Sequence, residues 1–368
     1  MNKHSKSHGT GYLTLASGEV FQGELYGAPL LASGEVVFHT GMTGYQEVMS
    51  DPSFAGQIVT FTYPLIGNYG TNECDYEALK PALSGIIVSE LCEAPSHFRS
   101  SHTLAEVAEQ FGIPVLSGID TRTITKRVRS HGDVYGVLSD KPLSAEEVAQ
   151  FRSKQAGSSL VERVSTTQPI AYPGTKEHVV IVDLGMKKSI LDAILAQGCR
   201  VTVVPFNSTC EDIVSLEPDA LVFSNGPGDP ADLLSYCEEW RKAAEKFPTL
   251  GICLGHQVIS LMYGAKTERL PYGHRGSNHP VKNLQSGKVY MTSQNHGYVV
   301  KDDSIDNRQL AVTYRNVNDG SIEGVQHLYL PIQSVQFHPE AHPGPDDTGY
   351  IIEQFIKSLQ MIGAKQHA

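Results

Sequence analysis

Residues 248–257 hold a cysteine in a setting that suits a nucleophile. A short apolar stretch leads through Gly251 to Cys253, and Gly255 follows at the start of an expected helix. A glycine–x–cysteine–x–glycine pattern between a strand and a helix has the layout of a nucleophile elbow, with sulfur in place of oxygen. We expect the glycines to permit a turn so sharp that the Cys253 side chain stands exposed above the strand end. A helix N-terminus and a neighbouring imidazole both favour the reactive thiolate form.

Two residues later in the chain can complete such a site. His338 and Glu340 lie two positions apart around Pro339, which enforces extended backbone. Residues i and i+2 of an extended segment point to the same side, so the imidazole and the carboxylate can work as one unit. His338 would take the thiol proton and later give it to a leaving amine, while Glu340 orients the ring and stabilises its cation. The three side chains predict a Cys–His–Glu acyl-transfer site.

A glycine loop and a histidine pair allow more than one interpretation. Gly226 and Gly228 flank a proline after an apolar stretch, so their backbone N–H groups could form an oxyanion hole together with the amide of Leu254. An ordinary turn with a capped helix at Asp229 explains the same loop equally well. His274 and His279 suggest a metal, but no third ligand stands near them in a segment that reads as a loop, so we predict no metal site.

The periodicity of the chain divides it into two domains that must position these residues. From His178 onward apolar strands alternate with helices, which predicts an α/β fold with an open, largely parallel sheet flanked by helices. Ligands of such sheets lie beyond the carboxyl ends of the strands, where the cysteine, the glycine loop and the histidine all fall. The first half reads as an α+β domain. We predict domains over 11–151 and 177–361, joined by a linker over 152–176.

Composition limits the function classes. The chain has 368 residues and a formal net charge of −11 with no long basic stretch, which argues against a nucleic-acid partner. No apolar run is long enough to cross a bilayer. The first ten residues are polar, so we expect a frayed end and not a secretory signal. The six cysteines show no Cys-x-x-Cys spacing, so we expect reduced thiols in the cytoplasm. Cys237 lies on an apolar helical stripe, and we expect it in the core.

Three motifs together resemble the class I, triad-type glutamine amidotransferases. They are Gly-Ile-Cys-Leu-Gly-His-Gln at 251–257, Ser-Asn-Gly-Pro-Gly-Asp-Pro at 224–230 and Phe-His-Pro-Glu at 337–340. The first half narrows the resemblance to the small subunits of carbamoyl-phosphate synthases. The stretches that carry it lie at 43–47, 51–53, 62–68 and 117–122.

The resemblance implies a role for particular residues. Cys253 would attack the side-chain amide of L-glutamine to form a glutamyl thioester, with His338 and Glu340 completing the triad. The residues that would hold glutamine are Ser53, Gly226, Gly228, Leu254, Gln257, Asn295, Gly297 and Tyr298. The family often has phenylalanine at the position of Tyr298.

The resemblance also implies a partner. Ammonia would pass to a large synthetase subunit, which would use bicarbonate, ATP and Mg²⁺ to make carbamoyl phosphate. This chain would carry no cofactor itself. An anthranilate- or GMP-type amidotransferase is an alternative that the first domain argues against. A non-catalytic binding protein with the same fold is a second alternative, which the complete triad argues against. The resemblance does not decide whether the carbamoyl phosphate would serve arginine synthesis or pyrimidine synthesis.

Overall fold

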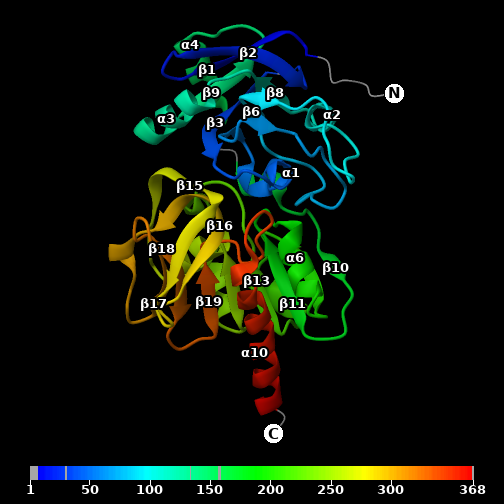
Figure 1. Cartoon of the computed structure of the whole chain (residues 1–368). Coiled ribbons are helices and arrows are strands. Elements are labelled where there is room, and N and C mark those ends of the chain that lie inside the picture. Colours follow the sequence, from blue (N-terminus) through cyan, green and yellow to red (C-terminus); the bar gives the residue numbers. More distant parts are fainter. Residues whose placement is uncertain (1–6, 30, 133, 156–158, 367–368) are drawn as a thin grey trace. The chain divides into compact units, whose positions relative to one another are not determined.

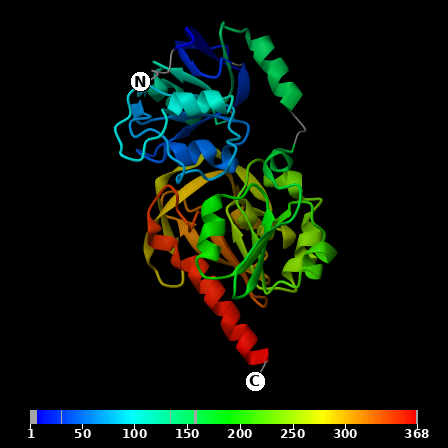
Figure 2. The same ribbon diagram turned by 90° about the vertical axis from the view of Figure 1, so that its right-hand side faces the viewer.

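The chain forms two compact units, Met1–Ser158 and Ser159–Ala368, which Figures 1 and 2 show in two views turned by 90°. The computed structural model describes residues 7–29, 31–132, 134–155 and 159–366. The first six residues of the segment expected to fray lie outside the described residues. The division falls within the predicted linker at 152–176. That segment also carries two elements of the second unit, α5 (Leu160–Val164) and β10 (Ile170–Tyr172).

Unit 1 is built on a closed seven-stranded barrel in the order β1-β2-β8-β6-β4-β3-β9. Its strands are β1 (Thr10–Leu15), β2 (Val20–Gly27), β3 (Ala32–His39), β4 (Gln57–Phe61), β6 (Gly85–Ile87), β8 (Pro114–Ser117) and β9 (Tyr135–Ser139). Successive side chains of β3 point to opposite faces of the barrel wall, and both faces are buried. Val36 packs in one cluster with Ile124 of α3 (Thr121–His131), and Val37 packs in another with Leu104 of α2 (Leu104–Gln110).

Helices complete the α+β character predicted for the first domain, which is confirmed. They are α1 (Tyr45–Ser50), the 3₁₀ turn η1 (Pro52–Phe54), α2 (Leu104–Gln110), α3 (Thr121–His131) and α4 (Ala145–Gln155). A short pair of strands, β5 (Leu65–Ile66) and β7 (Glu90–Leu91), lies outside the barrel. Local signals fix the helix starts: Thr103 and Glu106 form a capping box before α2, and the Asp120 side chain caps α3. Closure of the strands into a barrel was not predicted.

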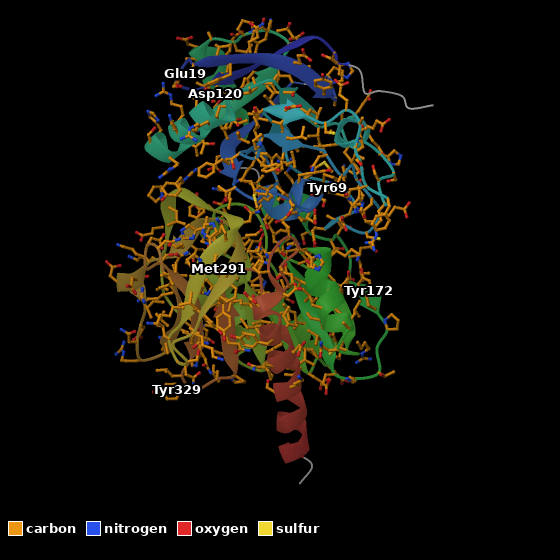
Figure 3. The ribbon with its side chains drawn as sticks, viewed as in Figure 1. Glu19, Tyr69, Asp120, Tyr172, Met291 and Tyr329 are labelled. Atoms are coloured by element: carbon orange, nitrogen blue, oxygen red, sulfur yellow. The ribbon has the colours of Figure 1, made fainter. Side chains whose placement is uncertain are left out.

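Unit 2 contains one ten-stranded sheet in the order β10-β12-β11-β13-β14-β19-β18-β17-β15-β16. Five central strands run parallel: β12 (Arg200–Pro205), β11 (His178–Asp183), β13 (Ala220–Phe223), β14 (Thr249–Ile252) and β19 (Ile332–Val335). Tyr172 on β10 and Met291 on β16 mark the two edge strands in Figure 3. The parallel centre confirms the predicted α/β class.

Helices cover both faces of the parallel strands. The helices are α6 (Lys188–Leu195), α7 (Cys210–Ser215), α8 (Cys237–Ala244), α9 (Leu254–Met262) and α10 (Tyr350–Gln366). Val179 and Ile181 of β11 pack in one cluster with α6 and α10, while Val180 and Val182 pack in another with α8 and α9. Strands buried on both faces need continuous apolar runs, which explains why sequence periodicity located them well.

The other half of the sheet is antiparallel, so "largely parallel" describes only the centre. It consists of β18 (Ile322–His327), β17 (Leu310–Asn316), β15 (Thr267–Asn283) and β16 (Val289–Val300). The loop expected around His274 and His279 is wrong, because both residues lie on β15. That strand is polar, and its pairing with β16 shifts register between Arg269 and His274 and between Gly276 and His279. Bulges of this kind erase the alternation by which a strand is recognised.

The parallel strands bring four loops to one edge of the sheet. Their carboxyl ends lead into 184–187 after β11, 224–229 after β13, Cys253 after β14 and 336–340 after β19. Parallel neighbours end on the same side, so the predicted site residues of these loops converge there. Within the described residues, no helix combines the length and apolar character that crossing a bilayer requires. All six cysteines are free thiols.

Candidate active site

Cys253 is the single residue between the end of β14 and the start of α9. Its backbone has φ 55° and ψ −105°, a conformation rare for any residue except glycine. Such backbone strain, of order 1–3 kcal/mol, is typical of functional positions. The side chain is only 2% exposed, so the expectation of an exposed thiol is wrong. Strand β16 covers it, with the carbonyl oxygen of Asn295 3.8 Å from Sγ.

The two flanking glycines act differently from the expectation. Neither adopts a positive φ, so Cys253 itself makes the sharp turn. A Cβ on Gly255 would lie 2.1 Å from the carbonyl oxygen of Phe223, and one on Gly251 would lie 2.6 Å from the carbonyl oxygen of Gly255. Both glycines are therefore required by close packing of the helix start against the sheet, and not by the freedom of their own dihedral angles.

His338 lies beside both predicted partners. Its Nδ1 is 2.6 Å from Oε1 of Glu340, and its backbone N–H donates to the carbonyl of Ser293 at 2.9 Å. Nε2 is buried and makes no hydrogen bond of ordinary geometry with the described residues. The Cys253 thiol nevertheless lies close enough to act on the pKa of the ring as a hydrogen-bond partner. Nδ1 faces Glu340, which leaves Nε2 as the ring nitrogen available to the Cys253 thiol.

The histidine and the glutamate form a buried ion pair. Burial by itself lowers the pKa of His338, but the Glu340 carboxylate and the Cys253 thiol outweigh it and raise the pKa to about 10. Burial by itself raises the pKa of Glu340, but the charges of Lys187 and His338 hold it at about 2. Both side chains are therefore charged at neutral pH, and the carboxylate stabilises the imidazolium.

Lys187 is a member of this site that sequence reasoning missed. Its Nζ donates to Oε1 of Glu340 at 3.1 Å and to the carbonyl of Ala341 at 2.7 Å, and the residue is 2% exposed. Its backbone N–H donates to Oδ1 of Asn225 at 2.9 Å. One signal could have revealed it: Lys187 follows the carboxyl end of β11, at the edge where ligands of parallel sheets bind.

The glycine loop after β13 fits tightly against its surroundings. A Cβ on Gly226 would lie 2.0 Å from the carbonyl oxygen of Leu184 and 2.9 Å from the side chain of Leu254. The Asp229 side chain caps the next element, as expected, but that element is the 3₁₀ helix η2 (Pro230–Leu233), and α8 begins only at Cys237. As the first residue of α9, Leu254 has a backbone N–H with no acceptor in a preceding helical turn. The helix therefore does not use this N–H, and its service to an oxyanion stays a prediction.

A hydrogen-bond chain links α9 and β16 to the cysteine. Nε2 of Gln257 donates to the carbonyl of Tyr298 at 2.7 Å and to Oε1 of Gln336 at 2.9 Å. Nε2 of Gln336 in turn lies 3.7 Å from Sγ of Cys253. Sequence reasoning missed Gln336, which lies directly after β19.

The remaining predicted glutamine contacts fall in different parts of the chain. Strand β16 carries three of them within four positions, at Asn295, Gly297 and Tyr298. All three are partly exposed, which leaves them accessible to a ligand. Ser53 belongs to unit 1, where it is buried in η1 and its N–H donates to Oδ1 of Asp51 at 2.8 Å. A contact between Ser53 and glutamine therefore stays a prediction.

Comparison with known proteins gives matches over both units. Residues 13–138 match the family "Carbamoyl-phosphate synthase small chain, CPSase domain", and residues 180–358 match "Glutamine amidotransferase class-I". An arginine-specific small chain of carbamoyl phosphate synthase from Halalkalibacterium halodurans is 49% identical, covering 96% of this chain and 98% of that one. A pyrimidine-specific small chain from the same organism is 48% identical over 95% and 96% of the two chains.

Two further proteins are similar to this chain over different lengths. The carbamoyl phosphate synthase small chain of Fusobacterium nucleatum is 48% identical, covering 94% of this chain and 97% of that one. A solved structure of a putative GMP synthase protein from Thermoplasma acidophilum covers 53% of this chain and 100% of its own, with 21% identity and a TM-score of 0.45.

Proposed function

Because the chain belongs to the family of carbamoyl phosphate synthase small chains, we propose that Cys253 carries out its glutamine hydrolysis through a covalent thioester. The enzyme is a glutamine-hydrolysing amidotransferase, and its second unit is the class I amidotransferase domain. One observation carries the assignment of residues. The strained Cys253 lies beside a buried His338, whose other ring nitrogen is 2.6 Å from the Glu340 carboxylate.

The geometry supports a definite order of proton transfers. The proton of the Cys253 thiol already resides on Nε2 of His338 before substrate binds, because a ring whose pKa lies near 10 retains it. The thiolate then attacks the side-chain carbonyl carbon of glutamine, and the resulting oxyanion receives hydrogen bonds from backbone N–H groups of Leu254 and the loop at Gly226 and Gly228. His338 gives its proton to the departing nitrogen, which leaves as ammonia and the thioester remains.

Hydrolysis of the thioester completes the cycle. A water molecule loses a proton to His338 and attacks the thioester carbonyl, and the sulfur leaves with that proton as glutamate forms. Through both halves Glu340 stabilises the imidazolium. Glutamine itself would be held by Ser53, Gln257, Asn295, Gly297 and Tyr298, with the partly exposed residues of β16 forming one wall of the pocket.

The ammonia requires an acceptor on another chain. We infer that a large synthetase subunit in the same cytoplasmic complex combines it with bicarbonate in ATP- and Mg²⁺-dependent steps to give carbamoyl phosphate. Relatives named arginine-specific and pyrimidine-specific are nearly equally similar, at 49% and 48% identity. Overall identity therefore does not favour either pathway for this chain.

Labelling with an electrophilic glutamine analogue tests the assignment. A diazoketone analogue should add one covalent mass to the full-length chain, located by peptide mapping at Cys253, and excess glutamine should protect against it. Cys237 provides a matched control, because it is buried on α8 and burial raises the pKa of its thiol to about 11. A label that appears on other cysteines only, or none at concentrations where glutamine binds, would instead favour a non-catalytic protein that only binds glutamine.

A further inference from the structure

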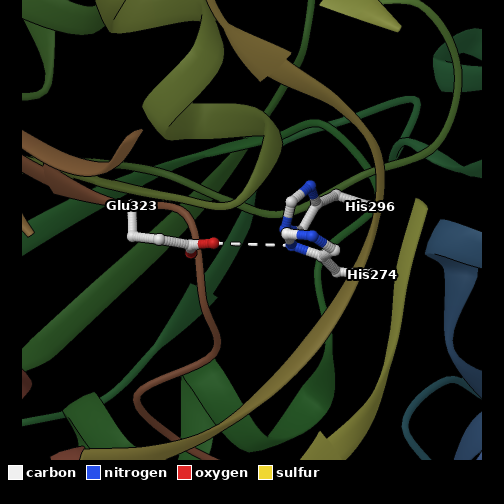
Figure 4. A group of neighbouring side chains, drawn as sticks. All are labelled: His274, His296 and Glu323. Atoms are coloured by element: carbon white, nitrogen blue, oxygen red, sulfur yellow. Dashed lines mark ion pairs between the residues drawn. The ribbon is translucent and has the colours of Figure 1, made fainter. Parts of the chain in front are cut away.

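Three buried side chains from the antiparallel part of the sheet lie close together. His274 lies on β15, His296 on β16 and Glu323 on β18. One nitrogen from each ring and one carboxylate oxygen lie within 4.8 Å of one another (Figure 4). Nδ1 of His274 and Oε1 of Glu323 are 3.5 Å apart. Two imidazoles and one carboxylate are a common ligand set for first-row transition metals.

Each histidine is oriented as a metal ligand usually is. Nε2 of His274 lies 2.8 Å from Oδ2 of Asp319, and Nδ1 of His296 lies 2.9 Å from the carbonyl oxygen of Tyr298. A ligating histidine ordinarily uses its other ring nitrogen in this way, with a carboxylate or a backbone carbonyl. The nitrogen left on each ring faces the shared centre. That of His274, Nδ1, makes no hydrogen bond of ordinary geometry among the described residues and faces Oε1 of Glu323 at 3.5 Å.

A further side chain makes the centre attractive to a cation. Oε1 of Gln294 lies 3.1 Å from Nε2 of His296. The orientation of this amide follows from its nitrogen, which donates to Oε2 of Glu323 at 3.0 Å and to Oγ1 of Thr292 at 3.1 Å. His296 thus meets an acceptor at both ring nitrogens, although a neutral imidazole has only one N–H.

Full protonation of the ring is opposed by its surroundings. Burial and the neighbouring His274 lower the pKa of His296 well below its ordinary value. A neutral His296 ring therefore turns one lone pair toward an acceptor oxygen. A positive ion between Nε2 of His296 and Oε1 of Gln294 removes this conflict.

The distances are close to those that a tetrahedral ion needs. With metal–ligand bonds of about 2.0–2.1 Å, neighbouring ligand atoms are about 3.3 Å apart. The His274–Glu323 and His296–Gln294 separations of 3.5 and 3.1 Å already match this value. None of the three ligand atoms lies more than 4.8 Å from another, so binding requires the side chains to close by at most about 1.5 Å.

The centre also has an entrance. A cavity of about 370 Å³ is lined by His274 and Asp319, and two more carboxylates, Glu268 and Asp302, line it as well. Acidic walls attract cations and raise their local concentration. An ion can thus reach the cluster without passing the catalytic cysteine.

We propose that His274, His296 and Glu323, with Oε1 of Gln294 as a fourth ligand, bind a divalent transition-metal ion of the Zn²⁺ type. The mixed nitrogen and oxygen donors exclude Ca²⁺ and Mg²⁺, which take oxygen ligands. All four donors come from protein, so the site is structural. The ion ties β15, β16 and β18 together and stiffens the strand that carries Asn295 and Tyr298. This proposal does not depend on the chemistry at Cys253.

Metal titration of the full-length, tag-free chain tests the site. After treatment with a chelator, the protein should bind one Zn²⁺ with a Kd in the micromolar range or tighter, and its Tm should rise with Zn²⁺ concentration. Co²⁺ used as a probe should give the intense visible absorption of a four- or five-coordinate ion. Octahedral Co²⁺ on surface histidines absorbs only weakly, so the spectrum separates this site from adventitious binding.

Variants assign the ligands. Glu323→Gln and His296→Asn should each weaken Zn²⁺ binding at least tenfold and abolish the intense Co²⁺ bands. His279→Asn is the matched control, since its ring stacks on His274 at 4.9 Å but is not a member of the cluster, and it should bind as the parent does. Weak Co²⁺ absorption by the parent chain overturns the proposal without reference to any variant. Parent-like binding by Glu323→Gln overturns it as well.

Discussion

Nζ of Lys187 lies 3.1 Å from Oε1 of Glu340, and both side chains are almost completely withdrawn from solvent. The carboxylate therefore has two cationic partners, this ammonium and the imidazolium of His338. A buried charge with a partner removed is costly, so each member of the set depends on the others. Lys187 also holds the Ala341 carbonyl, in the turn that follows the triad.

Lys187→Met should therefore damage both stability and catalysis. We expect a loss of about 3–5 kcal/mol in the free energy of unfolding, because Glu340 loses a buried partner. The turnover number for glutamine hydrolysis should fall more than tenfold, because the carboxylate is held less firmly against His338. Denaturant unfolding and a glutaminase assay measure the two effects. Lys188→Met is the matched control: this exposed neighbour pairs with Asp192 on the surface and should cost less than about 1 kcal/mol. Equal effects of Lys187→Met and Lys188→Met would contradict the assignment of Lys187 to the active site.

Cys253→Ala should abolish glutamine hydrolysis by about four or more orders of magnitude, as losses of a nucleophile do. Synthesis from free ammonia in the reconstituted complex with a large subunit should survive, because that reaction does not use the thiol. Cys237→Ala controls for removing a buried sulfur and should keep most of the glutaminase activity. Loss of the ammonia-dependent reaction in the Cys253 variant would contradict the division of labour between the two chains.

His338→Ala should reduce the turnover number more than Glu340→Ala does. The first change removes the base, whereas the second removes only the group that orients the base and stabilises its cation. Measured side by side at one pH, the two rates should differ by at least tenfold. Equal or inverted losses would assign the roles differently.

Much of this site was predictable because it is encoded locally. The elbow at Cys253 depends on two glycines that lie two residues away, and the pairing of His338 with Glu340 depends on a two-residue spacing in extended backbone. The central strands, such as β11, are apolar on both faces and stand out as runs. Because these strands run parallel, their carboxyl ends all lie at the same edge of the sheet.

The features that were missed arise from tertiary packing. The position of Lys187 after β11 places it at the ligand-binding edge, but its partner Glu340 lies 153 residues away and their contact becomes visible only in three dimensions. The cluster of His274, His296 and Glu323 draws one member from each of three strands, and β15 itself was concealed by its polar sequence and shifted register. The exposure expected for Cys253 was wrong for the same reason, because β16 covers the elbow from a distant part of the chain.

The His338–Glu340 pair should make stability depend on pH in a defined direction. The pKa of His338 is raised to about 10 in the folded chain, against about 6.5 when unfolded. Its contribution to the free energy of unfolding is therefore complete below pH 6.5 and is lost as the pH rises through 10. The pKa of Glu340 is lowered to about 2, so its contribution is present above about pH 4.3 and is lost as the pH falls through 2.

The difference in Tm between the parent chain and His338→Asn should accordingly be larger at pH 6 than at pH 9.5. Scanning calorimetry or fluorescence melting at the two pH values measures it. His131→Asn, at the exposed end of α3, is a suitable comparison for the loss of a surface histidine. A Tm difference that stays constant or grows with pH would show that His338 is neutral in the folded chain.

Gly255→Ala tests the revised role of the elbow glycines. The new Cβ would lie 2.1 Å from the Phe223 carbonyl oxygen, and a backbone atom in the sheet cannot move aside as a flexible side chain can. We expect at least about 2 kcal/mol of destabilisation and loss of glutaminase activity, since α9 must shift and carry Cys253 with it. Gly349→Ala is the control: its Cβ would meet nothing closer than 3.6 Å, at φ −54°, and unfolding should change by less than about 1 kcal/mol. If Gly255→Ala were as mild, close packing against the Phe223 carbonyl would not be what requires a glycine at this position.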